Sequence, residues 1–217
     1  IVANNNNIPY VYDEIKQNIL LEHRIGDKYR SVFHKHNGYE IYLILQGDIN
    51  LLIENSCFHI ERGTLAVINP TEYHRAVSLD GGLYERYTLN LNSNYLRTLS
   101  TDKTNFTSFF DKKNPGSNSI VTLPEDDIEE LIKLFTSLKQ ALYDDSFAND
   151  VLVNSYCMQI LHFVCRRFVE SDNIPISIMP TLITDTIQYI SDNISKSFTL
   201  ADIENELGYN KDYISKS

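Results

Sequence analysis

Short apolar runs, separated by turn residues, fill the first 91 positions of the chain. Within these runs apolar and polar residues often alternate, which is the period of a half-buried β-strand. Pairs such as Asn37-Gly38, Gly47-Asp48 and Asn69-Pro70 supply turn chemistry between the runs. The pattern predicts strands over Ile19–Ile25, Arg30–His34, Glu40–Leu45, Ile49–Ile53, Phe58–Ile60, Leu65–Ile68, Arg75–Ser78 and Tyr84–Leu91. Short strands at such regular spacing are typical of an antiparallel barrel or a double-sheet roll.

The hydrophobic period changes to that of a helix after residue 120. Thr122-Leu123-Pro124-Glu125 resembles a capping box with proline in the first turn of a helix. Apolar residues then recur at helical spacing at Ile128, Leu131, Ile132, Phe135, Leu138 and Leu142, and a second helical run covers Phe147 to Phe168. Only 143–146 separate the two runs, so we expect an antiparallel helical hairpin within 120–170.

The end of the chain predicts two short helices that meet at a tight turn. Pro180 opens a third helix, with apolar residues at Ile183, Ile187, Ile190 and Ile194. Thr199-Leu200-Ala201-Asp202 is a second capping box, and Gly208 ends the helix that it starts. Asn210 then caps another helix through Ile214. This arrangement is typical of a helix-turn-helix motif over 180–217.

Composition narrows the class of protein. The 217 residues, 42% of them hydrophobic, suffice for a sizeable domain with further elements. The net charge of −10 gives no overall basic footprint for nucleic acid. Cys57, Cys157 and Cys165 fit neither a disulfide framework nor a zinc pattern, and they indicate small buried side chains in a reducing compartment. We therefore expect a cytoplasmic protein without a signal peptide or membrane span.

Histidines and a carboxylate form the most informative local pattern. His34 and His36 point to one side of a strand, because strand side chains alternate with period two. Glu40 and His74 can converge on the same side from neighbouring strands. The four residues are an acceptable ligand set for Zn, Fe, Mn or Ni. The alternative, which we favour, is a hydrogen-bonded polar cluster that recognises a ligand without any metal or other cofactor.

A small-molecule site is the second prediction for this region. Small barrels enclose one ligand between an apolar wall and a few polar groups. Tyr42 shares a strand face with Glu40, and Arg86 alternates with Glu85 and Tyr87 on the last strand. The predicted ligand-binding residues are His34, His36, Glu40, Tyr42, His74 and Arg86. Ordinary packing at a sheet edge explains Arg86 equally well.

Two parts of the chain resemble the AraC-type family of bacterial transcription regulators. His34-x-His36-x3-Glu40-x6-Gly47 resembles the first cupin motif, and Gly63 to His74 resembles the second. The cupin pattern is not complete, because Lys28 and Ser78 stand where a glycine and an asparagine are expected. Residues 187–193 and 199–216 resemble the opening of the family's DNA-binding domain. The resemblance covers nearly the whole chain, and the modules follow in the family's order.

The resemblance implies a fold of three parts. An N-terminal antiparallel cupin barrel (a double-stranded β-helix) with its arm would occupy 1–95, and a helical hairpin for homodimerisation 120–170. A partial, all-α helix-turn-helix domain would occupy 180–217, with a second motif beyond Ser217. The apolar stripe from Ile128 to Leu142 has two interpretations, a cover for the barrel or a dimer interface. We favour a homodimer, because the stripe is longer than one barrel face needs.

The resemblance also implies a function that is not enzymatic. A sugar or another metabolite would bind in the barrel as an effector and control binding to promoter DNA. The exposed positions of the second helix would face DNA at Lys211, Asp212, Ser215 and Lys216. Residues 199–217 carry two lysines against four acidic residues, so this piece alone should bind DNA weakly. A metal-dependent cupin enzyme, such as an isomerase or a dioxygenase, is the alternative. The net charge of −10 also keeps open a third option, a sugar-binding or oligomerising module without a role on DNA.

Overall fold

The computed structural model describes residues 11–26, 32–79, 82–111, 119–171 and 199–207. Ten strands and five helices lie within these ranges. The strands are β1 (Val11–Asp13), β2 (Ile19–Gly26), β3 (His34–His36), β4 (Gly38–Gln46), β5 (Ile49–Ile53), β6 (Ser56–Ile60), β7 (Thr64–Ile68), β8 (His74–Ser78), β9 (Tyr84–Asn92) and β10 (Ile120–Thr122). The helices are α1 (Ser93–Thr98), α2 (Phe106–Asp111), α3 (Glu125–Ala141), α4 (Asn149–Glu170) and α6 (Leu200–Leu207).

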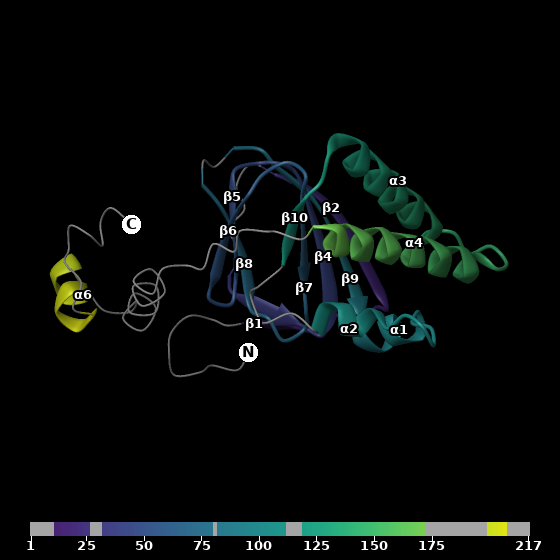
Figure 1. Ribbon diagram of the computed structural model, residues 1–217, viewed down its shortest axis with the longest axis horizontal. Helices are drawn as coiled ribbons and strands as arrows, with labels where there is room; N and C mark the ends of the chain where they lie inside the picture. The colour runs from purple at the N-terminus through teal and green to yellow at the C-terminus, as the bar shows by residue number, and fades with distance from the viewer. Residues whose placement is uncertain (1–10, 27–31, 80–81, 112–118, 172–198, 208–217) are drawn as a thin grey trace.

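The strands form two five-stranded sheets that face each other (Figure 1). One sheet has the order β1-β3-β8-β5-β6, and the other has the order β10-β7-β4-β9-β2. Every pair is antiparallel except β1 with β3. The architecture is a cupin-like β-sandwich followed by helices, as the sequence predicts.

Alternation along each strand gives the sheet of β4 and β9 two different apolar faces. Tyr42 and Ile44 point into the sandwich, where they pack with residues of the opposite sheet such as Leu51 and Phe58. The intervening residues of β4, such as Leu43, point outward into a second core. The sequence predicts both faces of β4, because side chains one position apart must lie on opposite sides.

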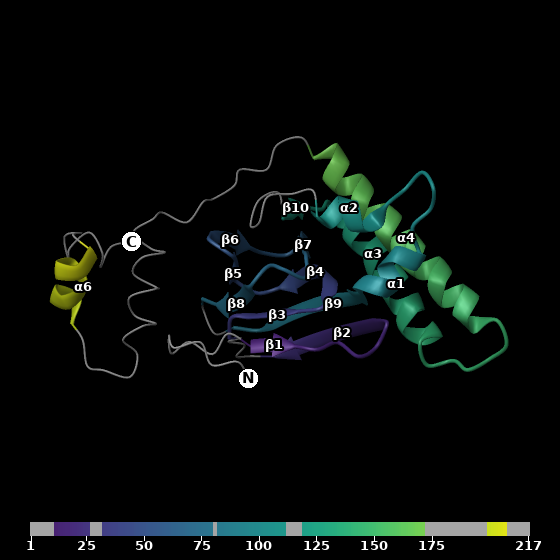
Figure 2. The same ribbon diagram turned by 90° about the horizontal axis from the view of Figure 1, so that it is seen from below.

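Helices α1 to α4 cover the outer face of the sheet that contains β4 and β9 (Figures 1 and 2). Leu131, Phe135 and Leu138 of α3 have no exposed surface and pack with α4 against the sheet. Arg167 of α4 pairs with Asp127 of α3 at 2.5 Å. The apolar stripe of α3 is therefore buried within the chain, and its length by itself is no evidence of association.

The structure corrects the sequence prediction in several elements. The predicted capping box at residue 122 is wrong, because Thr122 belongs to β10 and Pro124 is the N-cap of α3 without a side-chain cap. The short elements β1, β10, α1 and α2 were not predicted from the sequence. β10 pairs with β7, so the sandwich takes a strand from beyond the predicted boundary at residue 95. A strand of three residues, such as β10, is too short to show a hydrophobic period in the sequence.

The capping box at the start of α6 is confirmed. The Thr199 backbone N–H donates to Asp202 Oδ2 at 2.7 Å, and the Asp202 N–H donates to Thr199 Oγ1 at 3.4 Å. The predicted helix from Pro180, the turn at Gly208 and the helix from Asn210 lie outside the described residues.

No helix in the described ranges is long and apolar enough to cross a membrane.

Candidate effector site

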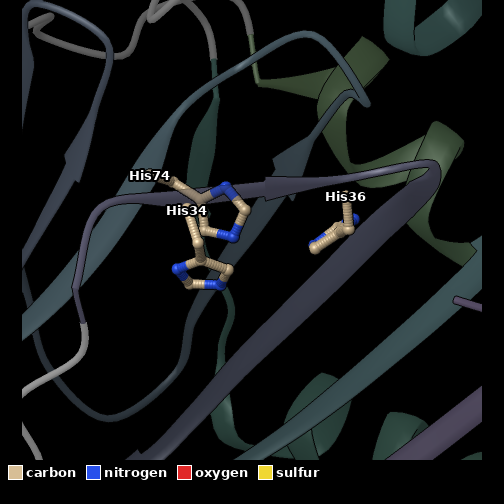
Figure 3. Close-up of side chains that lie close together, drawn as sticks. All are labelled: His34, His36 and His74. Atoms are coloured by element: carbon tan, nitrogen blue, oxygen red, sulfur yellow. The ribbon is translucent and has the colours of Figure 1, made fainter. Parts of the chain in front are cut away.

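Three short segments bring the histidines and Glu40 together inside the sandwich. His34 and His36 lie on β3, Glu40 on β4 and His74 on β8, where His34 and His74 are direct partners across the strand pair. The imidazole centroids of His34 and His74 are 4.2 Å apart, and those of His36 and His74 are 5.1 Å apart. Figure 3 shows the three rings converging on one space.

The tight connection between β3 and β4 positions this cluster. Asn37 fixes the connection, because its side-chain Oδ1 accepts a hydrogen bond from the Ile15 N–H at 2.8 Å. Gly38 follows, and a Cβ there would lie 2.9 Å from Ile15 Cδ1 and 3.3 Å from the Leu91 carbonyl oxygen. The glycine thus permits the close approach of this connection to Ile15 and to the backbone of Leu91 on β9.

Each histidine of the cluster is oriented by a backbone carbonyl. Nδ1 of His34 lies 3.0 Å from Val32 O, Nδ1 of His36 lies 2.9 Å from Gly38 O, and Nδ1 of His74 lies 3.1 Å from Glu72 O. A carbonyl oxygen can only accept, so each Nδ1 must carry the proton. The Nε2 atoms of all three rings are left for other partners.

Glu40 is a buried carboxylate held in its charged form. It is 5% exposed, and its Oε2 lies 2.8 Å from His36 Nε2 and 3.7 Å from His74 Nε2. Burial alone would raise the pKa of Glu40, but the hydrogen bond from His36 and the nearby histidines lower it to about 2. Burial also disfavours the charged form of His36. The hydrogen bond to Glu40 and the charge of Glu40 have the larger combined effect, so the pKa of His36 is raised.

His74 differs from His36 in its protonation. Burial lowers the pKa of His74 to about 4, and the charge of Glu40 offsets this only in part. His74 is therefore neutral near pH 7, with a lone pair on Nε2. The cluster accordingly offers both a charged pair and a neutral nitrogen donor.

The cluster lines part of a cavity of ≈ 340 Å³ between the two sheets. Polar residues dominate its wall, with a few apolar ones between them. The lining residues are Asp13, Glu14, Ile15, Gln17, Leu20, Glu22, Arg24, His34, His36, Glu40, Tyr42, Leu51, His74, Ala76, Arg86, Thr88 and Asn90. A cavity of this size accommodates a small metabolite.

Three buried polar atoms on this wall have no hydrogen-bond partner within the described structure: Tyr42 Oη, His74 Nε2 and Asn90 Oδ1. Their residues are between 3% and 6% exposed. Buried polar groups are nearly always paired, and an unpaired one costs roughly 1–3 kcal/mol. Such atoms lining one cavity indicate that a polar ligand or water completes them.

All six predicted ligand-binding residues line this cavity: His34, His36, Glu40, Tyr42, His74 and Arg86. The Arg86 guanidinium lies 5.6 Å from the Tyr42 ring centroid and 4.9 Å from that of Tyr84. Burial of Arg86 to 5% exposure places it inside the sandwich and not in edge packing. Whether the six residues bind a ligand stays a prediction.

Sequence reasoning missed Thr88 and Asn90 of β9 and Glu22 and Arg24 of β2 as cavity residues. The period of two that placed Arg86 continues to Thr88 and Asn90, so this signal was available. β2 joins the wall only through its pairing with β9, in which Arg24 opposes Arg86. The predicted DNA-facing residues Lys211, Asp212, Ser215 and Lys216 lie outside the described residues.

The donor set also fits a metal ion. His34, His36 and His74 each offer one ring nitrogen, and these nitrogens lie within 4.8 Å of one another. The unpartnered Nε2 of His74 is an available ligand atom, and imidazole suits Zn, Cu, Fe and Ni.

Fold and site together define a cupin-like ligand-binding domain with a polar internal cavity. Residues 18–161 match the family described as AraC-like ligand binding domain. The match spans more than half of the chain, so the chain belongs to this family. A comparison with curated proteins gives no significant match.

Several solved structures are similar to this chain. Apo ToxT K231A from Vibrio cholerae has 16% identity and a TM-score of 0.48, and the alignment covers 94% of this chain and 75% of ToxT. Wild-type ToxT with a bound unsaturated fatty acid has 14% identity and a TM-score of 0.48, covering 93% and 74%. A Cupin 2 conserved barrel domain protein from Salinispora arenicola has 16% identity and a TM-score of 0.33, covering 37% and 69%.

Proposed function

We propose that this chain is the effector-binding part of a cytoplasmic, ligand-responsive transcription regulator. The observation that carries the proposal is the internal cavity, where Tyr42, His74 and Asn90 present buried polar atoms without partners. Membership of the AraC-like ligand binding domain family supports the same function. An effector that completes these hydrogen bonds would stabilise the conformation of the protein that binds it most tightly.

The chemistry of the cavity favours a small, hydroxyl-rich or anionic effector. Arg86 and the Tyr42 hydroxyl provide donors, and Glu40, His74 Nε2 and Asn90 Oδ1 provide acceptors. Sugars and small metabolites with hydroxyl or carboxylate groups match such a wall.

The proposed output is binding to promoter DNA through helix-turn-helix motifs. The capped helix α6 supports this output, because it coincides with the first helix of the predicted motif. Lys211, Asp212, Ser215 and Lys216 are the proposed DNA-facing residues, and a second motif would follow them. Effector binding would alter DNA affinity by a coupling free energy of typically ~1–3 kcal/mol.

DNA binding by the complete gene product tests this function. The probe is a labelled DNA fragment from the region upstream of the gene, and the measurement is fluorescence anisotropy at low salt. We expect binding at least about 1,000-fold tighter than to random DNA of equal length. Equal affinity for the two DNAs, with and without small-molecule extract from the native cells, would contradict the proposal.

A homodimer is part of the proposal. Val151, Met158 and Val169 of α4 lie on one helical stripe and are 63%, 40% and 73% exposed. An exposed apolar stripe on α4 is suited to a second copy of the chain. Sedimentation velocity should give a dimer for the wild type and a monomer for Met158→Glu, whereas Gln159→Glu on the neighbouring exposed position serves as the control. A monomeric wild type would contradict this part.

The second candidate is a metal-dependent isomerase or dioxygenase, which the histidine triad favours. The family is a ligand-binding domain typical of regulators, and this supports the first candidate. Sequence-specific DNA binding would decide for the regulator.

A further inference from the structure

Hydrogen-bond acceptors gather around Glu40 in the cavity between the two sheets. Glu40 on β4 is the direct partner of Asn90 on β9, and both side chains line the cavity, so they lie next to each other. His74 approaches from the opposite sheet, and its Nε2 lies 3.7 Å from Glu40 Oε2. A carboxylate, an amide oxygen and an imidazole nitrogen from three strands therefore face the same part of the cavity.

Two of these acceptors have no donor from the protein. In neutral His74, Nδ1 donates to Glu72 O, which leaves Nε2 as an acceptor. His74 Nε2 and Asn90 Oδ1 have no hydrogen-bond partner within the described residues, and the two side chains are 3% and 6% exposed. A group that fills this part of the cavity must bring N–H or O–H donors.

The charge of the cavity wall favours a cation over a neutral donor. Positive charge comes from Arg24, Arg86 and the charged His36. The carboxylates outnumber these cations, because four of them line the cavity: Asp13, Glu14, Glu22 and Glu40. Two of the four, Asp13 and Glu14, are exposed, where their charge attracts cations to the cavity.

A primary ammonium group has the chemistry that this part of the wall lacks. It carries three donors, no acceptor and a positive charge, so one such group can donate to Glu40, His74 and Asn90 together. A hydroxyl group donates only one hydrogen bond and brings no charge. Hydrogen bonds in which one partner is charged are also the stronger ones.

Arg86 provides a positive group in the same cavity. It is 5% exposed, and its guanidinium lies 5.6 Å from the centroid of the Tyr42 ring. Tyr42 follows Glu40 by two residues on β4, which is about 7 Å along the strand. A carboxylate at Arg86 would therefore lie several bond lengths from an ammonium group at Glu40.

We propose that the effector is a short ω-amino acid, with its ammonium group on Glu40, His74 and Asn90 and its carboxylate on Arg86. The inference rests on the proposed function, because it names the class of molecule that the cavity binds. A chain of a few carbons, as in γ-aminobutyrate or δ-aminovalerate, joins the two charged ends. Charged partners at both ends distinguish this zwitterion from a neutral polyol.

Binding of matched amines and alcohols to the wild-type chain tests the proposal. The probes are γ-aminobutyrate and δ-aminovalerate, and their counterparts are γ-hydroxybutyrate and δ-hydroxyvalerate, in which a hydroxyl replaces the ammonium group. Chemical shifts of the backbone amides in NMR spectra measure each affinity at pH 7. We expect at least one amino acid to bind about 10-fold or more tightly than its hydroxy counterpart. n-Butylamine, which lacks the carboxylate, should also bind about 10-fold more weakly or worse.

Two results with the wild type overturn the proposal, and neither needs a variant. One is the absence of shifts with both amino acids up to about 10 mM, since small ligands that fit a site reach millimolar affinity. The other is equal affinity for an amino acid and its hydroxy counterpart. Equal affinity for n-butylamine overturns the assignment of the carboxylate to Arg86.

Substitutions of Asn90 test the acceptor role. Asn90→Leu should weaken binding of the amino acid by about 10-fold or more, whereas Asn90→Asp keeps an acceptor and should retain it. Asn50→Leu is the matched control, because Asn50 lies on β5 outside the cavity wall. The amide spectrum itself verifies that each variant is folded. An equal loss in Asn90→Leu and Asn90→Asp overturns the acceptor role.

The result is separable from that for the regulator, because the titrations involve no DNA. Preference for the hydroxy acids would leave an effector cavity for another class of molecule. Failure of DNA binding in the anisotropy experiment would leave an amino-acid-binding domain without the proposed output.

Discussion

Glu40 is a buried residue at which desolvation and hydrogen bonding oppose each other. Its carboxylate accepts from His36 and lies near His74, so the charged form prevails although the side chain is buried. Glu40→Gln keeps the shape of the side chain and removes the charge. We expect the free energy of unfolding at pH 7 to fall by about 1–3 kcal/mol, measured by urea denaturation in EDTA.

Glu61→Gln is the matched control, since Glu61 is exposed on the surface. Its effect should stay within about 0.5 kcal/mol. Equal stability of Glu40→Gln and the wild type would mean that the pair of Glu40 and His36 does not stabilise the fold.

Gly63 is the residue whose backbone depends most on the absence of a side chain. Its φ is +86°, and a Cβ would lie 2.9 Å from both Ile128 Cδ1 and the Leu123 carbonyl oxygen. Gly63→Ala should therefore destabilise the protein by about 2 kcal/mol or more, measured by thermal and urea unfolding. Gly26→Ala is the control, because no atom lies within 4 Å of its added Cβ. Equal destabilisation by both substitutions would contradict this explanation.

At the residue scale, spacing predicted the members of the cluster but not their hydrogen bonds. His34 and His36 share a side because strands have period two, and this needs no knowledge of the fold. The carbonyl partner of His74 Nδ1, Glu72 O, depends on the local backbone after Asn69. The order of residue types along the chain does not specify this backbone conformation.

At the element scale, a hydrogen bond joins α2 to the sheet beside the packing of its phenylalanines. The Tyr39 hydroxyl on β4 donates to Asp111 at the end of α2, at 3.0 Å to Oδ2. Burial and the charge of Asp111 raise the pKa of Tyr39 to about 12. Between pH 10 and about 12 the folded state thus keeps a proton that the unfolded tyrosine loses, and stability falls as pH rises.

Tyr39→Phe isolates this contribution. The variant should be less stable than the wild type by about 1 kcal/mol near pH 7, where the hydrogen bond is intact. The difference between the two proteins should shrink at about pH 11, because only the wild type loses stability through Tyr39. Urea denaturation at both pH values measures it. A difference that is constant or grows with pH would contradict the assignment.

Long periodic elements were predicted from the sequence, and short ones were not. β5 coincides with its predicted bounds, and the apolar stripe of α3 is buried as its spacing indicates. β10 has three residues and forms only through its pairing with β7. α1 begins with a local cap, in which Asn92 Oδ1 accepts from the Asn94 N–H, and this short signal lacks a following apolar period.

At the scale of the whole molecule, the two faces of one sheet link the cavity to the helices. Arg86 of β9 lies in the cavity, and its neighbour Tyr87 stacks on Phe135 of α3 with ring centroids 5.1 Å apart. A ligand that moved β9 would therefore act on α3 through this stacked pair. The sequence predicted the sandwich, the hairpin and their order, but the outer face on which the hairpin packs required the three-dimensional structure.

The most direct test of the central claim measures whether the cavity controls transcription. A reporter driven by the region upstream of the gene is compared in cells that carry the wild-type, Arg86→Gln or Glu61→Gln form of the complete gene product at equal protein levels. We predict that Glu61→Gln regulates like the wild type and that Arg86→Gln reduces the range of regulation by about 10-fold or more. Regulation by Arg86→Gln that matches the wild type would contradict the account.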